Sequence, residues 1–296
     1  MYDRLLFPTD GSEGAAAALD HALDLAAAHD ATLHVLNVAD TTRDSLTLVQ
    51  GDVVDALERE GERIVEAAAD RARSRGVDVV TAVLQGEPDR TIVDYAADRD
   101  VDLVVLPTHG RRGIERILLG STTERVVRRS TVPVLTLRPG TEPGYPYRDV
   151  LVPTDGSDCA AAALAVGADL ATAAGATLHL LSVVDVASLG IDVRTDLQAD
   201  ALEERATEVV GEAAKTATDA GVESVTEAVE SGASIHGTVE AYVAAHGVDV
   251  VVLGTHGRTG VDRYLLGSVA EKLVRTSPVP VLTVRAPDEA STDPAG

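Results

Sequence analysis

Cysteine and aromatic residues are almost absent from this sequence of 296 residues, which has one cysteine, no tryptophan, one phenylalanine and six tyrosines. The single cysteine, Cys159, excludes a disulfide within the chain and a zinc site built from cysteines, so an intracellular setting is expected. Because aromatic residues make up only 2% of the chain, we expect a core of Val, Leu, Ile and Ala.

Positive charge is also scarce: 25 Lys and Arg residues stand against 48 Asp and Glu residues, which gives a formal net charge of -23. Such a field repels phosphate backbones and anionic lipid surfaces, so we expect neither nucleic acid nor a membrane as a partner. The acidic residues are scattered along the chain, which indicates a solvated acidic shell. The composition resembles that of proteins from salt-accumulating halophiles, and an acidic protein from a GC-rich genome is the alternative.

Long hydrophobic runs are missing, since no window approaches the ~18 uninterrupted apolar residues of a membrane-spanning helix. The first residues carry charges where a signal peptide needs an apolar stretch, so a cytoplasmic location is expected. Apolar residues make up 45% and charged residues 25%, close to the average of folded proteins. At roughly 150 residues per domain, the length predicts about two domains.

Two sequence segments occur twice. The segment 5–12, LLFPTDGS, returns as VLVPTDGS at 150–157, and 101–111, VDLVVLPTHGR, returns as VDVVVLGTHGR at 248–258. The repeat distance is far too long for a solenoid, so each copy should be a complete domain. We expect domains at 1–138 and 148–285, a linker rich in Pro and Gly at 139–147, and a disordered polar tail at 286–296.

Within each copy, short β-branched runs alternate with longer Ala-rich stretches. This alternation indicates βαβ units, hence an α/β fold with a parallel sheet covered by helices on both faces. In the first copy we expect strands at 4–8, 32–38, 77–84, 102–106 and 132–137, and helices near 12–29, 53–75, 89–99 and 120–130.

A glycine-rich loop follows the fourth strand of the second copy. Gly254 and Gly257 end that strand, and Gly267-Ser268 opens the next helix. Glycines let backbone amides approach an anion, and a helix N-terminus favours phosphate. The alternative is structural, because Ser268-x-x-Glu271 and its counterpart Ser121-x-x-Glu124 have the pattern of a capping box.

Two aspartates, Asp10 and Asp155, each end the first strand of a copy in a Pro-Thr-Asp-Gly-Ser turn. Capping of the following helix, with Ser12 or Ser157 as N-cap, is one explanation. If the first and fourth strands are neighbours, their carboxyl ends form the crevice where ligands bind in such sheets. Asp10 would then face the loop from Gly110 to Ser121 and accept hydrogen bonds from ribose hydroxyls, and both roles are compatible.

These motifs resemble the universal stress protein family in its tandem two-domain form. The resemblance rests on the Pro-Thr-Asp-Gly-Ser turn, the Gly-x2-Gly-x9-Gly-Ser loop and the strand 279–284, and it covers nearly the whole chain. It implies two tandem Rossmann-like domains of the adenine nucleotide alpha hydrolase type, each with a five-stranded parallel sheet in the order 3-2-1-4-5. It also implies a role in stress survival through bound ATP, with Mg²⁺ as an optional companion, or through protein partners.

The resemblance also implies nucleotide-binding positions in both copies. A base would lie against aliphatic residues rather than between aromatic rings, with Val183 and Val38 as the adenine contacts. Arg258 and Arg111 either meet phosphates or face water. Pro107 replaces the first glycine of the loop in the first copy. The remaining positions are Asp155, Gly254, Gly257, Gly267 and Ser268 in the second copy, and Asp10, Gly110, Gly120 and Ser121 in the first.

We expect no dedicated catalysis, because the chain has no Gly-x4-Gly-Lys loop, although slow ATP hydrolysis stays open. A scaffold that acts without nucleotide is the other alternative. His109 and His256 are expected to hydrogen-bond within their turns or to pack beside a ligand rather than to act in catalysis, and no histidine-based metal motif is present. Because the strands 132–137 and 279–284 are apolar edges, and such strands pair in this family, we expect the two copies to pair within one chain. A homodimer of the chain stays open.

Overall fold

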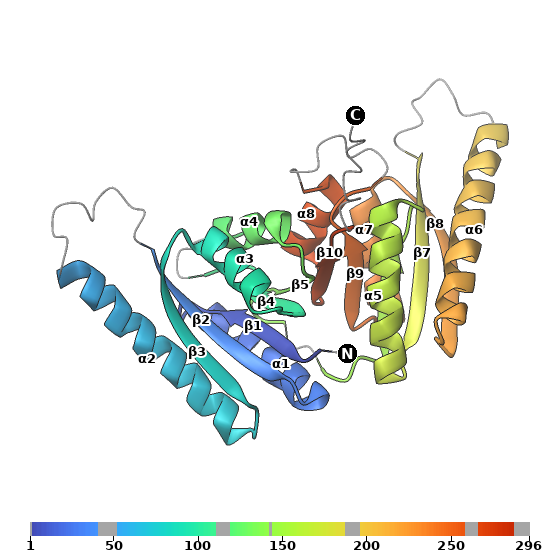
Figure 1. Ribbon diagram of the computed structural model, residues 1–296. Coiled ribbons are helices and arrows are strands. Elements are labelled where there is room, and N and C mark those ends of the chain that lie inside the picture. Colours follow the sequence, from blue (N-terminus) through green and yellow to red (C-terminus); the bar gives the residue numbers. More distant parts are fainter. Residues whose placement is uncertain are drawn as a thin grey trace, which may run out of the picture.

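The computed structural model describes residues 2–40, 52–110, 119–141, 144–186, 196–257 and 266–286. Strands and helices alternate through both halves, as the sequence predicts (Figure 1). The first half comprises β1 (Arg4–Pro8), α1 (Glu13–His29), β2 (Thr32–Asp40), α2 (Asp52–Ser74), β3 (Val79–Gly86), α3 (Pro88–Asp98), β4 (Leu103–Pro107), α4 (Ser121–Arg129) and β5 (Val134–Leu137). The second half comprises β6 (Asp149–Pro153), α5 (Asp158–Ala174), β7 (Thr177–Asp185), α6 (Asp196–Asp219), β8 (Ser224–Gly232), α7 (Ile235–His246), β9 (Val250–Gly254), α8 (Ser268–Thr276) and β10 (Val281–Val284).

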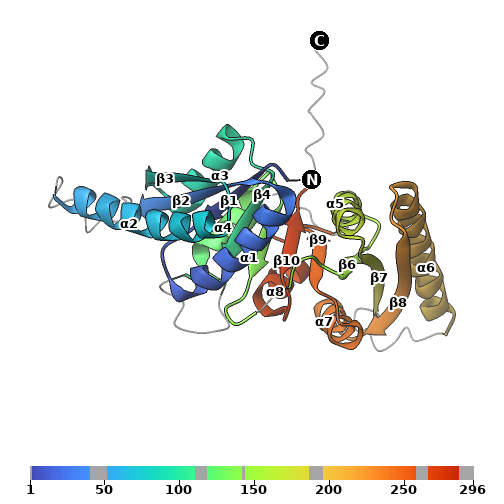
Figure 2. The same ribbon diagram turned by 90° about the horizontal axis from the view of Figure 1, so that it is seen from below.

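All strands belong to one ten-stranded sheet with the order β3-β2-β1-β4-β5-β10-β9-β6-β7-β8. Each half has the expected order 3-2-1-4-5 and is parallel throughout. The expectation of two separate five-stranded sheets needs one correction, because β5 and β10 pair antiparallel and join the halves, which lie side by side in Figure 2.

The junction between β5 and β10 confirms the predicted pairing of the two copies within the chain. Leu135 lies opposite Leu282, and two buried threonines complete the register. The hydroxyl of Thr136 donates to the carbonyl of Val281 at 3.1 Å, and that of Thr283 donates to the carbonyl of Val134, also at 3.1 Å. Each apolar edge strand thus covers the other, which removes two exposed edges from the sheet.

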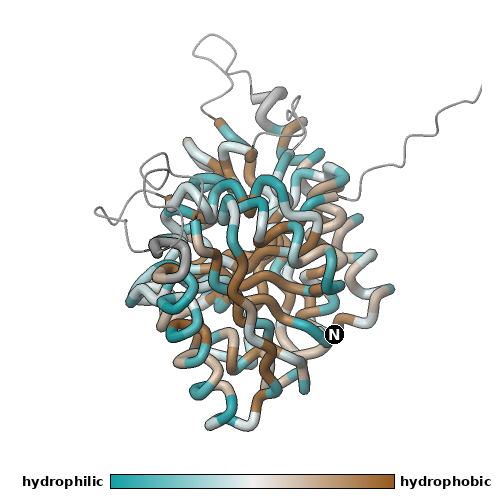
Figure 3. Tube along the Cα trace, turned by 60° about the vertical axis from the view of Figure 1, so that its left-hand side comes forward, coloured by the Kyte–Doolittle hydropathy of each residue, from teal (hydrophilic) through white to brown (hydrophobic). Residues whose placement is uncertain are grey.

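Helices cover both faces of this sheet. On one face α1, α2, α5 and α6 share a single core that runs across the junction, since Leu25 of α1, Leu170 of α5 and Leu135 of β5 belong to the same buried cluster. On the other face α3 and α4 pack on the first half, and α7 and α8 on the second. In Figure 3 the hydrophobic segments of the tube gather toward the middle of the molecule, with hydrophilic segments around them. The two halves therefore share one hydrophobic core on the face covered by α1, α2, α5 and α6.

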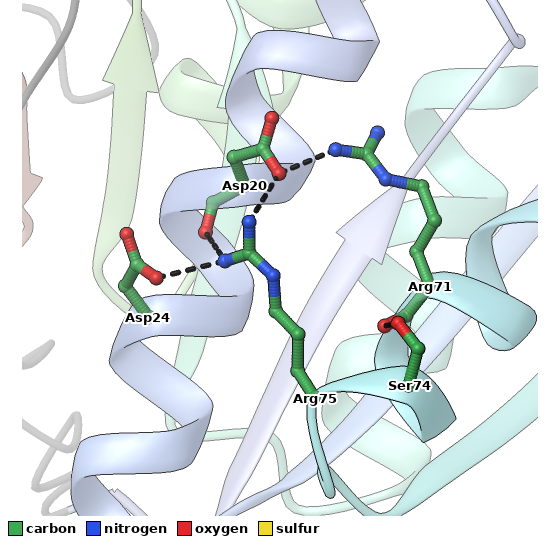
Figure 4. A network of polar contacts seen from close by, with 5 residues as sticks. All are labelled: Asp20, Asp24, Arg71, Ser74 and Arg75. Carbon is green, nitrogen blue, oxygen red and sulfur yellow. Dashed lines mark hydrogen bonds and ion pairs between the residues drawn. The ribbon is translucent and has the colours of Figure 1, made fainter.

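An ion-pair network holds α2 against α1 in the first half (Figure 4). Arg75 donates to the carboxylates of Asp20 and Asp24, each at 2.8 Å, and Arg71 also pairs with Asp20. At the corresponding positions of the second half, Asp20 and the two arginines are replaced by Ala165, Thr216 and Ala220. These half-exposed pairs each contribute little, about 1 kcal/mol or less, so the apolar core dominates the packing.

The remaining expectations concern the ends of the domains. β5 ends at Leu137 and β6 begins at Asp149, which places the predicted linker between them. The predicted disordered tail lies outside the described residues except for Ala286. None of the helices in the described ranges is both long enough and apolar enough to cross a membrane.

Candidate functional site

The strand arrangement expected to open a crevice between the first and fourth strands is present in both halves. β1 pairs with β4 only at Leu5 and Leu6, and β6 pairs with β9 only at Val150 and Leu151. Beyond these residues the first strand continues beside the second, and the fourth continues beside the fifth. The carboxyl ends of the two central strands therefore separate, which is the topological switch point where ligands bind in open α/β sheets.

The aspartate turn lies on one side of this crevice. Oδ1 of Asp10 accepts a hydrogen bond from the amide of Ser12 at 3.0 Å, and Oγ of Ser12 accepts one from the amide of Ala15 at 3.3 Å. In the second half, Asp155 and Ser157 repeat both hydrogen bonds at the same distances. The predicted N-cap serines are thus confirmed, and one oxygen of each aspartate is used to hold the turn.

The second oxygen of each aspartate lies against the loop on the other side of the crevice. A Cβ placed on Gly110 would be 2.5 Å from Oδ2 of Asp10, and one placed on Gly257 would be 2.7 Å from Oδ2 of Asp155. No real Cβ tolerates such distances, so only glycine lets the carboxylate approach the loop backbone. The structure therefore brings together the aspartate and the glycine that the sequence predicted as site partners in each half.

The loop closes on itself at its far end. The amide of Gly120 donates to the carbonyl of Thr108 at 2.8 Å, and the amide of Gly267 donates to the carbonyl of Thr255 at 2.8 Å. A Cβ on either glycine would lie within 3.1 Å of that carbonyl oxygen. These contacts bring the N-terminus of α4 or α8 back beside the start of its own loop.

The capping-box interpretation of Ser121 and Ser268 is wrong. The N-cap residues are Gly120 and Gly267, neither with a side-chain cap, so each serine is the first residue of its helix and is exposed. The carboxylates that would complete the box, those of Glu124 and Glu271, instead pair with Arg128 at 2.8 Å and Arg275 at 2.7 Å. Tertiary contact of the glycine amide with the strand end starts the helix one residue earlier than the motif suggests. The serine hydroxyls are thus located at a helix N-terminus, where the dipole favours an anion.

Gly254 has a packing role that sequence analysis missed. A Cβ on Gly254 would lie 2.7 Å from Cβ of Cys159 and 2.8 Å from its carbonyl oxygen, because the first turn of α5 passes directly over the end of β9. In the first half, Pro107 replaces Gly254 and Gly14 replaces Cys159. Each half therefore has one glycine in this pair of positions, and comparison of the two copies could have suggested the exchange.

The amide of Gly254 also has a definite direction. Its neighbour Thr255 donates an amide hydrogen bond to Val284 of β10 at 2.9 Å. Successive amides of a strand point to opposite sides, so the N–H of Gly254 is directed toward β6 and the crevice. At the corresponding position of the first half, Pro107 has no N–H.

Val38 and Val183, the predicted adenine contacts, are half-buried near the ends of β2 and β7. They pack on the face of the sheet covered by α3 and by α7, respectively. Sequence analysis missed Asn37, whose amide donates to the carbonyl of Thr9 at 2.7 Å next to the aspartate turn. The second half has Ser182 at this position, so this hydrogen bond of an asparagine amide is a feature of the first half.

The histidines of the Thr-His-Gly turns hydrogen-bond locally, which is one of the two roles expected for them. Nδ1 of His109 shares a hydrogen bond with Oγ1 of Thr108 at 2.9 Å, and that of His256 with Oγ1 of Thr255 at 3.0 Å. Arg111 and Arg258, expected either to meet phosphates or to face water, lie outside the described residues. Within the described ranges, no group of three or more His, Cys, Asp or Glu side chains is arranged to hold a metal ion.

Comparisons with known proteins agree with the resemblance seen in the sequence. The sequence model of the Universal stress protein family matches residues 1–138 and 146–285. A universal stress protein of Methanocaldococcus jannaschii is 33% identical over 141 residues, which cover 47% of this chain and 83% of that protein. One from Mycobacterium tuberculosis is 30% identical over 239 residues, covering 77% of this chain and 78% of that protein.

Among solved structures, the crystal structure of a universal stress protein from Archaeoglobus fulgidus has the same fold over nearly the whole chain. The TM-score is 0.73 at 24% sequence identity, with 96% of this chain and 98% of that chain covered. Coverage this complete includes both halves, so the tandem arrangement itself has a counterpart of known structure.

Proposed function

Because this chain belongs to the universal stress protein family, we propose that it binds adenine nucleotides, ATP first among them, in the crevice of each half and without dedicated catalysis. The observation that carries the proposal is the contact of an aspartate with a loop glycine across the crevice, present twice. A carboxylate fixed in this position accepts hydrogen bonds from ribose hydroxyls, as acidic residues do in related nucleotide sites.

The phosphates would lie at the end of the loop. Exposed Ser121 and Ser268 stand at the N-termini of α4 and α8, where amide groups and the helix dipole favour negative charge. The adenine would lie against Val38 or Val183, since the chain has no tryptophan and one phenylalanine. Mg²⁺ would then be brought by the nucleotide rather than by a cluster of protein ligands.

The second-half site should bind ATP more tightly. The amide of Gly254 is directed toward the crevice and can donate to the nucleotide, whereas Pro107 offers no donor. Loss of one such hydrogen bond, with some added crowding by the ring, corresponds to about 1 to 3 kcal/mol. The first-half site would therefore fill at higher ATP concentration.

Mass spectrometry of small molecules released when the purified chain is denatured tests the proposal, together with calorimetric titration by ATP. We expect adenine nucleotide in the released fraction and two unequal binding events. A chain that retains no nucleotide and shows no heat of binding would instead act as a scaffold without nucleotide. Phosphate release during the titration would identify slow hydrolysis.

Cys159 makes the second-half site separately observable. It is the only cysteine, it is half-buried, and it lies against Gly254. We expect ATP to slow its alkylation by iodoacetamide. Asp155→Asn retains an oxygen acceptor for the turn and should abolish this protection, while the matched variant Asp10→Asn should leave it intact. Equal protection in both variants would contradict binding at Asp155.

A further inference from the structure

Two arginines, one from each half of the molecule, reach across to the other half. Arg138 directly follows β5, and its Nη1 donates to the carbonyl oxygens of Thr276 at 2.6 Å and Ser277 at 3.4 Å. Arg285 directly follows β10, and its Nη1 donates to the carbonyl oxygen of Arg128 at 3.3 Å. Both arginines are half-buried.

Their acceptors are the last carbonyls of α8 and α4. The final carbonyls of a helix have no partner within it, and a cation placed there satisfies them and interacts favourably with the negative end of the dipole. Each of these helices therefore has a candidate phosphate site at its N-terminus and an arginine of the opposite half at its C-terminus. With nine residues, each helix is about 13 Å long.

The arginines also adjoin the loop of their own half. Leu137, immediately before Arg138, accepts the amide hydrogen bond of Thr108 at 2.8 Å, and Thr108 begins the first-half loop. Val284, immediately before Arg285, accepts that of Thr255 at 2.9 Å. A two-residue segment at the end of each central strand thus holds the loop of one site and the helix of the other.

We propose that Arg138 is a positioning residue for the nucleotide site of the second half, and Arg285 for that of the first half. This inference rests on the proposed function. Helices of nine residues are marginal on their own, so their position depends on contacts at both ends. The C-terminal hydrogen bonds to the opposite half fix α8 or α4 along its axis, and with it the amides and serine that face the phosphates.

A general stabilising role would give a different pattern. Removing an arginine that only strengthens the junction between the halves would lower the melting temperature and weaken both sites alike. The crossed hydrogen bonds predict instead that each arginine matters most for the site of the half to which it does not belong. Because the two arginines occupy corresponding positions, each serves as the control for the other.

The experiment measures ATP affinity by calorimetry in two backgrounds with one functional site each. Asp10→Asn leaves the second-half site, and Asp155→Asn leaves the first-half site. Arg138→Ala is expected to weaken the second-half site by about fivefold, the scale of a helix-terminus charge, and to change the first-half site by less than about twofold. Arg285→Ala should show the reverse with a smaller effect, because the hydrogen bond of Arg285 to the carbonyl of Arg128, at 3.3 Å, is longer than the 2.6 Å hydrogen bond of Arg138 to Thr276.

Arg138→Lys keeps a cation that can reach the same carbonyls, so it should restore most of the affinity. If Arg138→Ala does not fold, Arg138→Gln replaces it in the comparison of the two sites, because glutamine removes the positive charge and keeps a polar side chain. Equal weakening of both sites, or a lower melting temperature with unchanged affinities, would overturn the inference while leaving the proposed function intact. Absence of ATP binding in the unsubstituted chain would overturn the proposed function and this inference with it.

Discussion

Oδ2 of Asp155 lies only 2.7 Å from the position that a Cβ on Gly257 would occupy, too close for any side chain there. The contact joins two residues about a hundred positions apart and repeats between Asp10 and Gly110 at 2.5 Å. The glycine is therefore needed to hold the aspartate carboxylate in place, and not only to shape the loop. The carboxylate cannot keep its place once a methyl group is added.

Gly257→Ala should therefore displace the carboxylate of Asp155 and weaken ATP binding at the second-half site. A charged hydrogen bond contributes about 1.5 to 3 kcal/mol, so we expect a loss of roughly tenfold to a hundredfold, measured by calorimetry. Gly211→Ala is the control, because nothing lies within 4 Å of its added Cβ on α6. Unchanged affinity in Gly257→Ala would contradict the role of Asp155.

The asymmetry between the sites is best tested by exchanging the packed pair. Gly254→Pro alone would also collide with Cys159, so Gly254→Pro combined with Cys159→Gly reproduces the pair found in the first half. We expect the double variant to fold and to bind ATP more weakly at the second-half site, by about 1 to 3 kcal/mol. Pro107→Gly should strengthen the first-half site. Affinities that stay the same after both exchanges would refute the role of the Gly254 amide.

The sequence predicted the fold because its signals were local and repeated. The first strand was expected at 4–8 and lies at Arg4–Pro8, and the apolar strand 279–284 correctly indicated the pairing of the two halves. The contact of Gly254 with Cys159 was not predictable from either segment, since neither carries a pattern that refers to the other. The Ser-x-x-Glu motif failed for a related reason: a hydrogen bond from Gly120 to distant Thr108 decides where α4 begins.

Acid should destabilise the folded protein through His21 of α1, which contacts the segment that links the two halves. Its Nε2 shares a hydrogen bond with the hydroxyl of Tyr147 at 2.6 Å, and burial lowers the pKa of His21 to about 4, from 6.5. As the pH falls below 6.5, the unfolded chain binds a proton that the folded chain does not, so stability decreases until about pH 4. Between pH 7 and pH 5 the loss is about 2 kcal/mol.

Urea unfolding at both pH values, in the parent and in His21→Gln, measures this contribution. The variant keeps a hydrogen-bonding side chain but no proton-binding site, so it should lose about 2 kcal/mol less than the parent between pH 7 and pH 5. His236→Gln on α7 is the control. The idea fails if the parent and His21→Gln lose the same stability over this range.

Asp89 should be the most costly carboxylate to remove. Its side chain is 2% exposed at the start of α3, and it pairs with Arg125 at 3.3 Å and with Arg129, both on α4. Asp89→Ala leaves two arginines that water can partly solvate, so we expect a loss of about 2 kcal/mol in urea unfolding, less than for a fully buried pair. Arg63→Ala breaks the exposed pair with Glu60 and should cost under about 0.5 kcal/mol. Similar losses for both variants would show that burial of Asp89 does not matter.

Salt should stabilise this protein. The net charge of -23 means that repulsion between carboxylates outweighs the attraction within surface ion pairs, each of which contributes about 1 kcal/mol or less. Raising KCl from about 0.01 M to 1 M shortens the Debye length from about 30 Å to about 3 Å, which screens this repulsion and that between the protein and an anionic nucleotide. We therefore expect both the melting temperature and the ATP affinity to rise over this range.

An uncharged osmolyte at equal osmolality is the control, because it does not shorten the Debye length. A melting temperature that stays flat or falls with KCl would contradict the halophile interpretation of the acidic surface, and a rise matched by the osmolyte would assign the effect to excluded volume instead of charge.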